Sequence, residues 1–257
     1  MSLANLPLPV IFFGSLVIIL GTGEFGYWAG SRAGKKGHGN VSVLESAALG
    51  LLALMIGFTF AMALARFEAR RDAILEEANA IGTTALRARL LPEPVRAESL
   101  DLLREYVKIR LDLVQRVPTQ EELRAALDYS NDVQERLWQQ VRNLASRDTG
   151  MVPTGLYIQS LNQMIDAQEK RIVAAINRVP FVVLLALYGI AAISSGFTGY
   201  GGGLAREHSR LPRYLMGIMV ASVILLIQDL DRPNSGFIKV SQRPMLDTAK
   251  SLDSYRD

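Results

Sequence analysis

Residues 57–71 read GFTFAMALARFEARR, an apolar run that turns into a charged one without interruption. No glycine or proline separates the apolar half from Arg66, Arg70 and Arg71. Glycine and proline are the residues that most strongly disfavour a helix interior, so their absence predicts one continuous helix. Its first half suits a bilayer and its second half suits water. The stretch therefore predicts a long helix that leaves the membrane without breaking.

Four stretches of the 257-residue chain carry almost no charge, namely 6–29, 46–65, 179–205 and 214–228. A membrane helix needs about 20 mostly apolar residues. Three stretches satisfy this, and the fourth does so from Leu211 if Arg213 extends to the interface. No Lys or Arg precedes the first stretch, which favours a span over a cleaved signal peptide. The alternative is four buried helices of a soluble protein.

The charged segment between the second and third spans has the pattern of further helices. The first helix covers 66–90 and is ended by the prolines at 92 and 94. A second helix fits 95–116. A third helix runs from a capping box at Thr119 and Glu122 to Ser146. A fourth runs from about Thr154 to the third span. Apolar residues recur in the second and fourth helices at helical spacing.

We therefore predict an all-α protein, a four-transmembrane-helix bundle with a large cytoplasmic helical bundle inserted between spans 2 and 3. The expected divisions are 1–65 for the first two spans, 66–178 for the helical domain, 179–230 for the other two spans and 231–257 for a cytoplasmic tail. Lys and Arg near the span ends are more frequent on the side of 66–178 than on the other side. This bias favours a cytoplasmic location for that segment and for both termini.

Several function classes are disfavoured by composition. The chain has no cysteine, so disulfides and thiolate chemistry are excluded. A net charge of +3 is too small to indicate a nucleic-acid partner. His38 and His208, with Glu45 and Glu207 near them in sequence, could bind a metal, but the histidines lack a local i,i+4 pairing. We expect no metal, no cofactor and no enzymatic activity.

Glu24 is the one charged residue inside a predicted span. Ionisable residues in spans are costly and usually paired or functional. Glu24 lies late in its span, before Tyr27 and Trp28, which are typical of the membrane interface. We interpret it as an interfacial acid with a partner such as Arg32. The alternative is a pore-lining or proton-sensitive role.

The second span has two notable rows. Ala53, Gly57, Ala61 and Ala65 recur every four residues, a pattern that lets helices pack closely in lipid. Leu54 and Phe58 form a neighbouring apolar row, with Gly50 one turn earlier. Periodicity alone favours lipid or core contact for this second row; an apolar ring in a symmetric pore is the alternative.

The same stretch resembles the second-helix signature of bestrophins. Gly57 and Phe58 are followed by Arg66 and Phe67, with Arg66 eight residues after Phe58. The segment DLDRPNSGFIKV at 229–240 resembles the bestrophin segment that leaves the last span, and the order of two spans, helical insert and two spans also matches. The chain looks most similar to the bacterial bestrophin-like family, which implies a bacterial inner membrane.

The resemblance implies a homo-oligomeric, pentameric ion channel that passes small anions, chloride among them, through a pore lined by the second span. It places Gly50, Leu54 and Phe58 in the pore neck. The family's Ile-Pro-x-Ser-Phe run reads GLLAL at 50–54 here, and only Asp229 and Asp231 remain of the acidic cluster that binds calcium in animal bestrophins. The implied partners are the lipid bilayer, further copies of the chain and small inorganic ions. The alternative function is a non-conducting scaffold or sensor that binds a cytosolic partner.

A structural role for Arg66 is predicted independently of the resemblance. Arg66 ends the second apolar stretch, and Asp229 and Asp231 end the fourth on the same predicted side. Partly buried charges need partners. We expect an ion pair between Arg66 and one of the two carboxylates.

Overall fold

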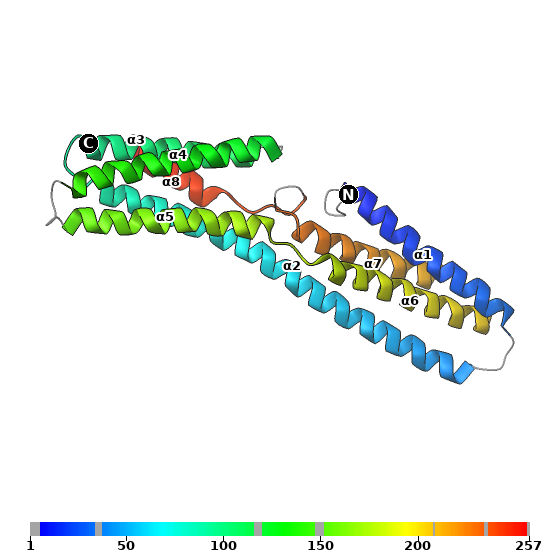
Figure 1. Cartoon of the computed structure of the whole chain (residues 1–257). Coiled ribbons are helices and arrows are strands. Elements are labelled where there is room, and N and C mark those ends of the chain that lie inside the picture. The colour runs from blue at the N-terminus through cyan, green and yellow to red at the C-terminus, as the bar shows by residue number, and fades with distance from the viewer. Residues whose placement is uncertain are drawn as a thin grey trace. The chain divides into compact units, whose positions relative to one another are not determined.

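The computed structural model describes residues 6–33, 38–115, 120–146, 152–207, 209–233 and 236–255. Within these ranges the chain is all-α, as predicted, and forms eight helices (Figure 1). They are α1 (Leu8–Arg32), α2 (His38–Ala88), α3 (Val95–Gln115), α4 (Gln120–Ala145), α5 (Val152–Ile176), α6 (Phe181–Ala205), α7 (Leu211–Leu230) and α8 (Arg243–Ser254). The predicted capping residue Thr119 lies outside the described residues.

Four helical stretches are long and apolar enough to cross a membrane, and each overlaps one of the four predicted spans. The stretch 57–71 lies wholly inside α2, a single helix of 51 residues. At 1.5 Å per residue such a helix is about 75 Å long, against about 30 Å for the hydrocarbon core of a bilayer. The prediction of one unbroken helix longer than a membrane span is confirmed.

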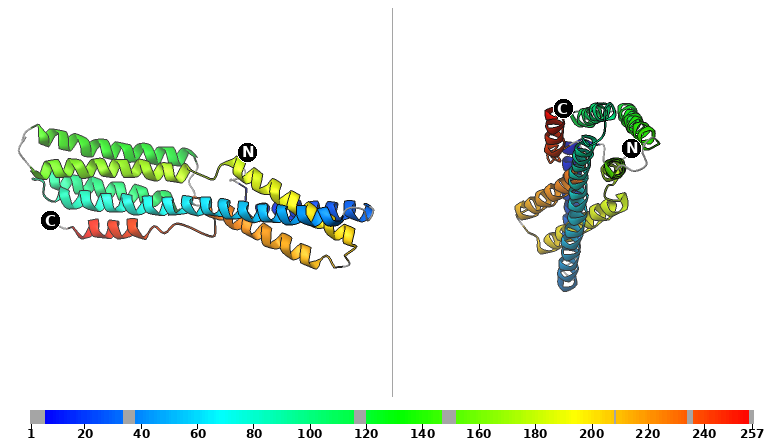
Figure 2. Two further views of the ribbon diagram at one scale, coloured as in Figure 1. Left: turned by 90° about the horizontal axis from the view of Figure 1, so that it is seen from below. Right: turned by 90° about the vertical axis from the view of Figure 1, so that its left-hand side faces the viewer.

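The chain divides into two compact units, and α2 contributes to both, changing unit between Phe67 and Glu68. The first unit contains α1, α6, α7 and the N-terminal part of α2. Its core is formed by buried apolar side chains of all four helices, among them Ile19, Leu52, Leu187 and Ile224. Helices α1, α6 and α7 pack side by side (Figures 1 and 2).

Helices α1 and α6 approach each other through glycines. A Cβ atom added at Gly26 would overlap the backbone oxygen of Gly196, and one added at Gly199 would overlap that of Gly23. Gly30 and Gly203 face backbone in the same way. The two backbones are therefore in direct contact along this seam, which only glycine permits.

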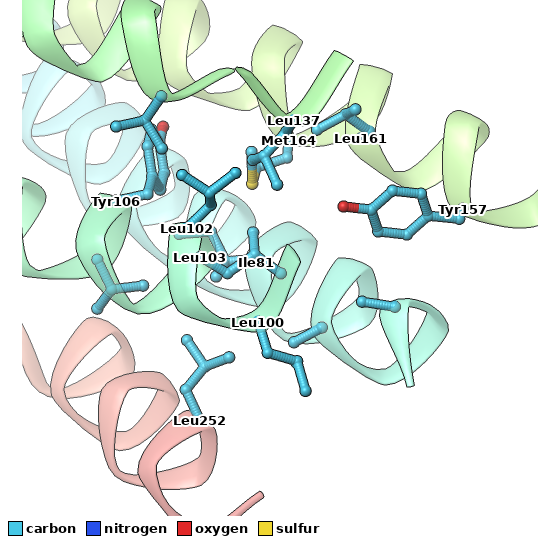
Figure 3. Packing of buried hydrophobic residues seen from close by; sticks show 14 of the residues in the cluster. Ile81, Leu100, Leu102, Leu103, Tyr106, Leu137, Tyr157, Leu161, Met164 and Leu252 are labelled. Atoms are coloured by element: carbon cyan, nitrogen blue, oxygen red, sulfur yellow. The ribbon is translucent and has the colours of Figure 1, made fainter. Parts of the chain in front are cut away.

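The second unit consists of the C-terminal part of α2 with α3, α4, α5 and α8 (Figure 2). Its core includes Ile81, Leu103, Leu137 and Met164 (Figure 3). Most of the apolar stripe predicted on α3 is buried here. Val173 and Ile176, apolar residues near the end of α5, are instead exposed.

Helix α8 was not predicted, because residues 231–257 were interpreted as a tail. Pro244 lies in its first turn, where proline is tolerated. Met245 and Leu252, seven residues apart, are its buried residues. This spacing of two helical turns was the available sequence signal.

Candidate functional site

The predicted pore residues lie on a face of α2 that the rest of the chain leaves uncovered. Gly50 is exposed, and Leu54 and Phe58 are 54% and 60% exposed. The opposite face of the same segment is buried, with Leu52 at 4% and Ala63 at 0%. Within one chain, α2 therefore packs on the other spans with one face only.

The small-residue row lies on the uncovered side as well. Ala53, Gly57, Ala61 and Ala65 are all exposed, and a Cβ atom added at Gly57 would meet nothing within 4 Å. The row packs against no other helix in the part of the chain that the structure describes. The close helix contact of this unit is the glycine seam between α1 and α6, which the same small-residue rule could have identified from the spacing of Gly26 and Gly30.

Glu24 is held by two arginines from the start of α7. Arg210 Nη1 donates to Glu24 Oε2 at 2.7 Å, and Arg213 Nη2 donates to Oε1 at 2.8 Å. The Tyr214 hydroxyl lies 3.0 Å from the same Oε1 atom. The residue suggested as its partner, Arg32, instead stacks over the Trp28 ring at 4.0 Å. Glu24 is thus paired, but across helices rather than along its own.

The acids at the end of α7 bind backbone amides. Asp229 accepts the N–H groups of Phe237 and Ile238 at 2.9 and 3.0 Å. Asp231 Oδ1 accepts the N–H of Val179, just before α6, at 2.9 Å. Arg66 is half-buried, and its ion pair with one of these two acids stays a prediction. These carboxylates do tie chain segments together, but through amides that lack helical partners.

Asp229 and Gly236 form one local clamp, because a Cβ atom added at Gly236 would overlap Asp229 Oδ1. We expect Asp229→Ala to leave two amides without acceptors and to speed their exchange at least tenfold, since a buried unsatisfied group costs about 1–3 kcal/mol. Hydrogen–deuterium exchange of residues 236–238, followed by mass spectrometry, measures this. Asp253→Ala, at an exposed position in α8, is the control. Unchanged exchange in Asp229→Ala would contradict the clamp.

A buried polar network in the second unit was not predicted. Glu77 of α2 is fully buried and lies 2.7 Å from Arg110 Nε and 2.5 Å from Arg171 Nη1. The Tyr106 hydroxyl lies 2.9 Å from Glu77 Oε1 and 2.7 Å from Gln168 Oε1. Burial, with the Glu77 carboxylate, raises the pKa of Tyr106 well above its usual value, so the phenol keeps its proton. The network joins α2, α3 and α5.

No metal site is found among the described residues, where no three His, Cys, Asp or Glu side chains gather to hold an ion. The side chains of His38 and His208, the two histidines considered from sequence, lie outside the described part of the chain.

Comparison with known proteins identifies the fold and the family. Residues 17–245 match the bestrophin-like domain. The structure is similar to a crystal structure of a bacterial bestrophin homologue from Klebsiella pneumoniae, with a TM-score of 0.64, 14% identity and coverage of 96% of each chain. A single-residue variant of such a homologue from the same organism gives a TM-score of 0.63 at 14% identity, covering 96% of this chain and 97% of that one. No curated protein sequence matches the chain.

The matched domain covers nearly the whole chain, including α2 with its uncovered face and the Asp229–Gly236 clamp. The alignment covers almost all of this chain and of each matched structure, so the similarity extends over the whole fold. The chain belongs to the bestrophin-like family.

Proposed function

We propose that the protein is a homo-oligomeric ion channel whose pore is lined by the uncovered face of α2. The observation that carries the proposal is that Leu54 and Phe58 are more than half exposed on a span whose other face is buried. A ring of such helices around an axis would cover this face and enclose an apolar constriction, which can control ion flow by dewetting. The family resemblance favours a pentamer.

The proposal includes a topology. Residues 66–178, the tail and both termini would lie in the cytoplasm of a bacterial inner membrane, and residues 1–65 and 179–230 would supply the spans. The bias of Lys and Arg toward the 66–178 side supports this orientation. The length of α2, which continues well past Arg66, supports an extramembrane second unit.

Two observations favour different ions. The resemblance favours small anions. The uncovered face of α2, however, also carries two exposed acids, Glu68 and Asp72. They follow Leu54, Phe58, Ala61 and Ala65 at intervals of three or four residues, so all six residues lie on one side of the helix. Carboxylates that follow a pore constriction attract cations. Arg71, 4.0 Å from Asp72, offsets part of this negative charge. Anion passage is the first candidate and cation passage the second.

Conduction is tested with purified protein in planar bilayers. We expect single-channel currents, and the reversal potential in a KCl gradient distinguishes anion from cation selectivity. Complete absence of current over a wide range of voltage and pH would instead favour a non-conducting scaffold or sensor, whose partner would bind the helical unit.

Cysteine scanning tests the pore-lining face, because the natural chain has no cysteine to react. We expect a charged, membrane-impermeant methanethiosulfonate reagent to reduce the current of Leu54→Cys and Phe58→Cys more than fivefold. The control Ile193→Cys, 59% exposed on α6, should keep its current. Block of the control but not of the α2 variants would place the pore elsewhere.

A further inference from the structure

Phe237 follows the last span, and at 80% no other large apolar side chain in the described part of the chain is more exposed. Gly236, Phe237 and Ile238 belong to the first unit, which contains the spans. Exposure changes from one residue to the next, because Ile238 is half-buried and packs against the core of that unit. The Phe237 side chain therefore points away from the helices.

The backbone at Phe237 is fixed, although its side chain is not covered. The N–H groups of Phe237 and Ile238 donate to the two carboxylate oxygens of Asp229, which is 3% exposed. Gly236 lies against the same carboxylate and leaves no room for a Cβ atom. Hydrogen bonds to a charged acceptor are among the stronger ones in proteins. The outward position of the phenyl ring is therefore set by the fold of this segment.

The ends of three spans place Phe237 at the membrane boundary. Arg232, just after α7, donates to the Leu6 carbonyl before α1, and Asp231 accepts the N–H of Val179 before α6. These span ends therefore lie at one level, and the Asp229 clamp brings Phe237 to it. Helix α7 has 20 residues. It is about 30 Å long, which is about the thickness of the hydrocarbon core.

The outer surface of α7 leads to the same place. Its outer row consists of exposed residues at intervals of three or four, namely Leu215, Met219, Ser222 and Leu226. One turn after Leu226 the row reaches Asp229, which is buried and bonded to the segment that contains Phe237. Phe237 therefore continues the outer surface of the span beyond the point where the helix row is covered.

This row is better suited to lipid than to another helix. Helix contacts in membranes favour small residues, and three of the four residues in the row are large. The first turn of α6, at the same level, also exposes apolar side chains, those of Phe181 and Val182. Phenylalanine at the boundary between headgroups and acyl chains is a common means of membrane attachment.

We propose that Phe237 is a membrane anchor whose ring inserts among the lipid chains at the level where the chain leaves the bilayer. Asp229 holds the ring in place through the two backbone amides. Entry of the ring into lipid removes its apolar surface from water. The anchor fixes the depth of the end of α7 and the point from which the chain continues to α8. It is separate from the uncovered face of α2.

Spin-label accessibility tests the anchor, because the natural chain has no cysteine and a single-cysteine variant carries one label. Phe237→Cys of the full chain is labelled with a nitroxide and placed in vesicles of phosphatidylethanolamine and phosphatidylglycerol. Oxygen concentrates in the apolar part of a bilayer, and a nickel chelate concentrates in water. We expect the ratio of oxygen to chelate accessibility at 237 to be about threefold or more above that of an aqueous control.

The same chain supplies both reference positions. Asp253→Cys, at an exposed position in α8, is the aqueous control, and Val17→Cys, 70% exposed on α1, is the reference in a span. A ratio at 237 equal to that at 253 would place the ring in water and overturn the anchor. Low accessibility of 237 to both reagents would show that protein covers the ring, as in a contact with a second copy, and would overturn it as well.

The role of the clamp is tested in the labelled chain. Asp229→Ala removes both acceptors, so the label at 237 should become more mobile, and its accessibility ratio should fall by about half or more. An unchanged ratio and line shape would mean that Asp229 does not position the ring. If Asp229→Ala does not fold, the label in the otherwise natural chain still decides whether the ring lies in lipid. None of these measurements depends on ion current, so failure of the anchor and failure of the channel are distinguishable.

Discussion

Gly199→Ala is expected to lower the unfolding midpoint by about 2–12 °C and to reduce the yield of monodisperse protein in detergent. The added Cβ atom would lie well under 3.0 Å from the backbone oxygen of Gly23. A backbone atom cannot rotate away as a side chain can, so α1 and α6 must separate along their glycine seam. Overpacking of this kind costs about 1–3 kcal/mol or more, and each kcal/mol corresponds to about 2–4 °C in a chain of this size.

The same chain offers matched controls for this substitution. Gly189 lies on α6 and Gly21 on α1, and an added Cβ atom would meet nothing within 4 Å at either position. Gly189→Ala and Gly21→Ala should fold with wild-type midpoints or slightly higher ones, since alanine favours a helix over glycine. A wild-type midpoint in Gly199→Ala would mean that the two helices are not in backbone contact. Size-exclusion chromatography and scanning fluorimetry provide both readouts.

The glycine seam illustrates what the sequence could and could not predict. A row of small residues indicates that a helix can pack closely, but it does not name the partner. The rule was applied to Ala53, Gly57, Ala61 and Ala65 of α2, which lie uncovered in a single chain. The row that does pack within the chain, with Gly26 and Gly30, was equally visible.

The sequence did not identify the partners of charged residues either. Hydropathy located the four spans, because twenty apolar residues in succession are rare outside membranes or cores. It could not place the partners of Glu24. Arg32 is eight residues away, about 12 Å along a helix axis. Arg210 and Arg213 reach the carboxylate because α1 and α7 pack together, and such packing depends on contacts between residues far apart in sequence.

The backbone contacts of Asp229 and Asp231 were not predicted, for a related reason. The prediction for Asp229 and Asp231 considered side-chain charges and ignored free backbone amides. A carboxylate can be satisfied by two N–H groups as well as by an arginine, and Phe237 and Ile238 supply them to Asp229. Amides at helix ends lack helical partners, so a carboxylate near a helix end should first be considered as an acceptor for backbone N–H groups.

The buried pair formed by Glu77 with Arg110 predicts the other large effect. Glu77→Gln should lower the stability of the second unit by about 3–5 kcal/mol, because removing one partner of a buried ion pair leaves the other charge uncompensated. Arg110 is 3% exposed and cannot turn to water, and Arg171 at 12% is little freer. Glutamine keeps the shape of the side chain and an acceptor for the Tyr106 hydroxyl. The loss of stability is therefore caused by the missing charge and not by altered packing.

The neighbouring residue gives the matched control, since the same substitution one position earlier removes an exposed pair. Glu76 pairs with Lys170, and both side chains are at least half exposed. Glu76→Gln should therefore cost no more than about 1 kcal/mol. Denaturant or thermal unfolding of the purified variants, followed by far-ultraviolet circular dichroism, measures the difference. Equal losses in the two variants would mean that Glu77 is solvated and that the network is not a buried one.

A double variant separates the cost of an orphaned charge from the value of the pair. In Glu77→Gln with Arg110→Met, the more deeply buried of the two guanidinium groups is gone and an apolar chain of similar length takes its place, while Arg171 remains. Such replacements of buried pairs are often neutral or stabilising, so the double variant should recover most of the loss. Recovery would show that the network contributes little net stability and fixes instead the positions of α2, α3 and α5. If the double variant is less stable than Glu77→Gln alone, Arg110 stabilises the unit through contacts other than Glu77, and the network cannot be treated as one pair.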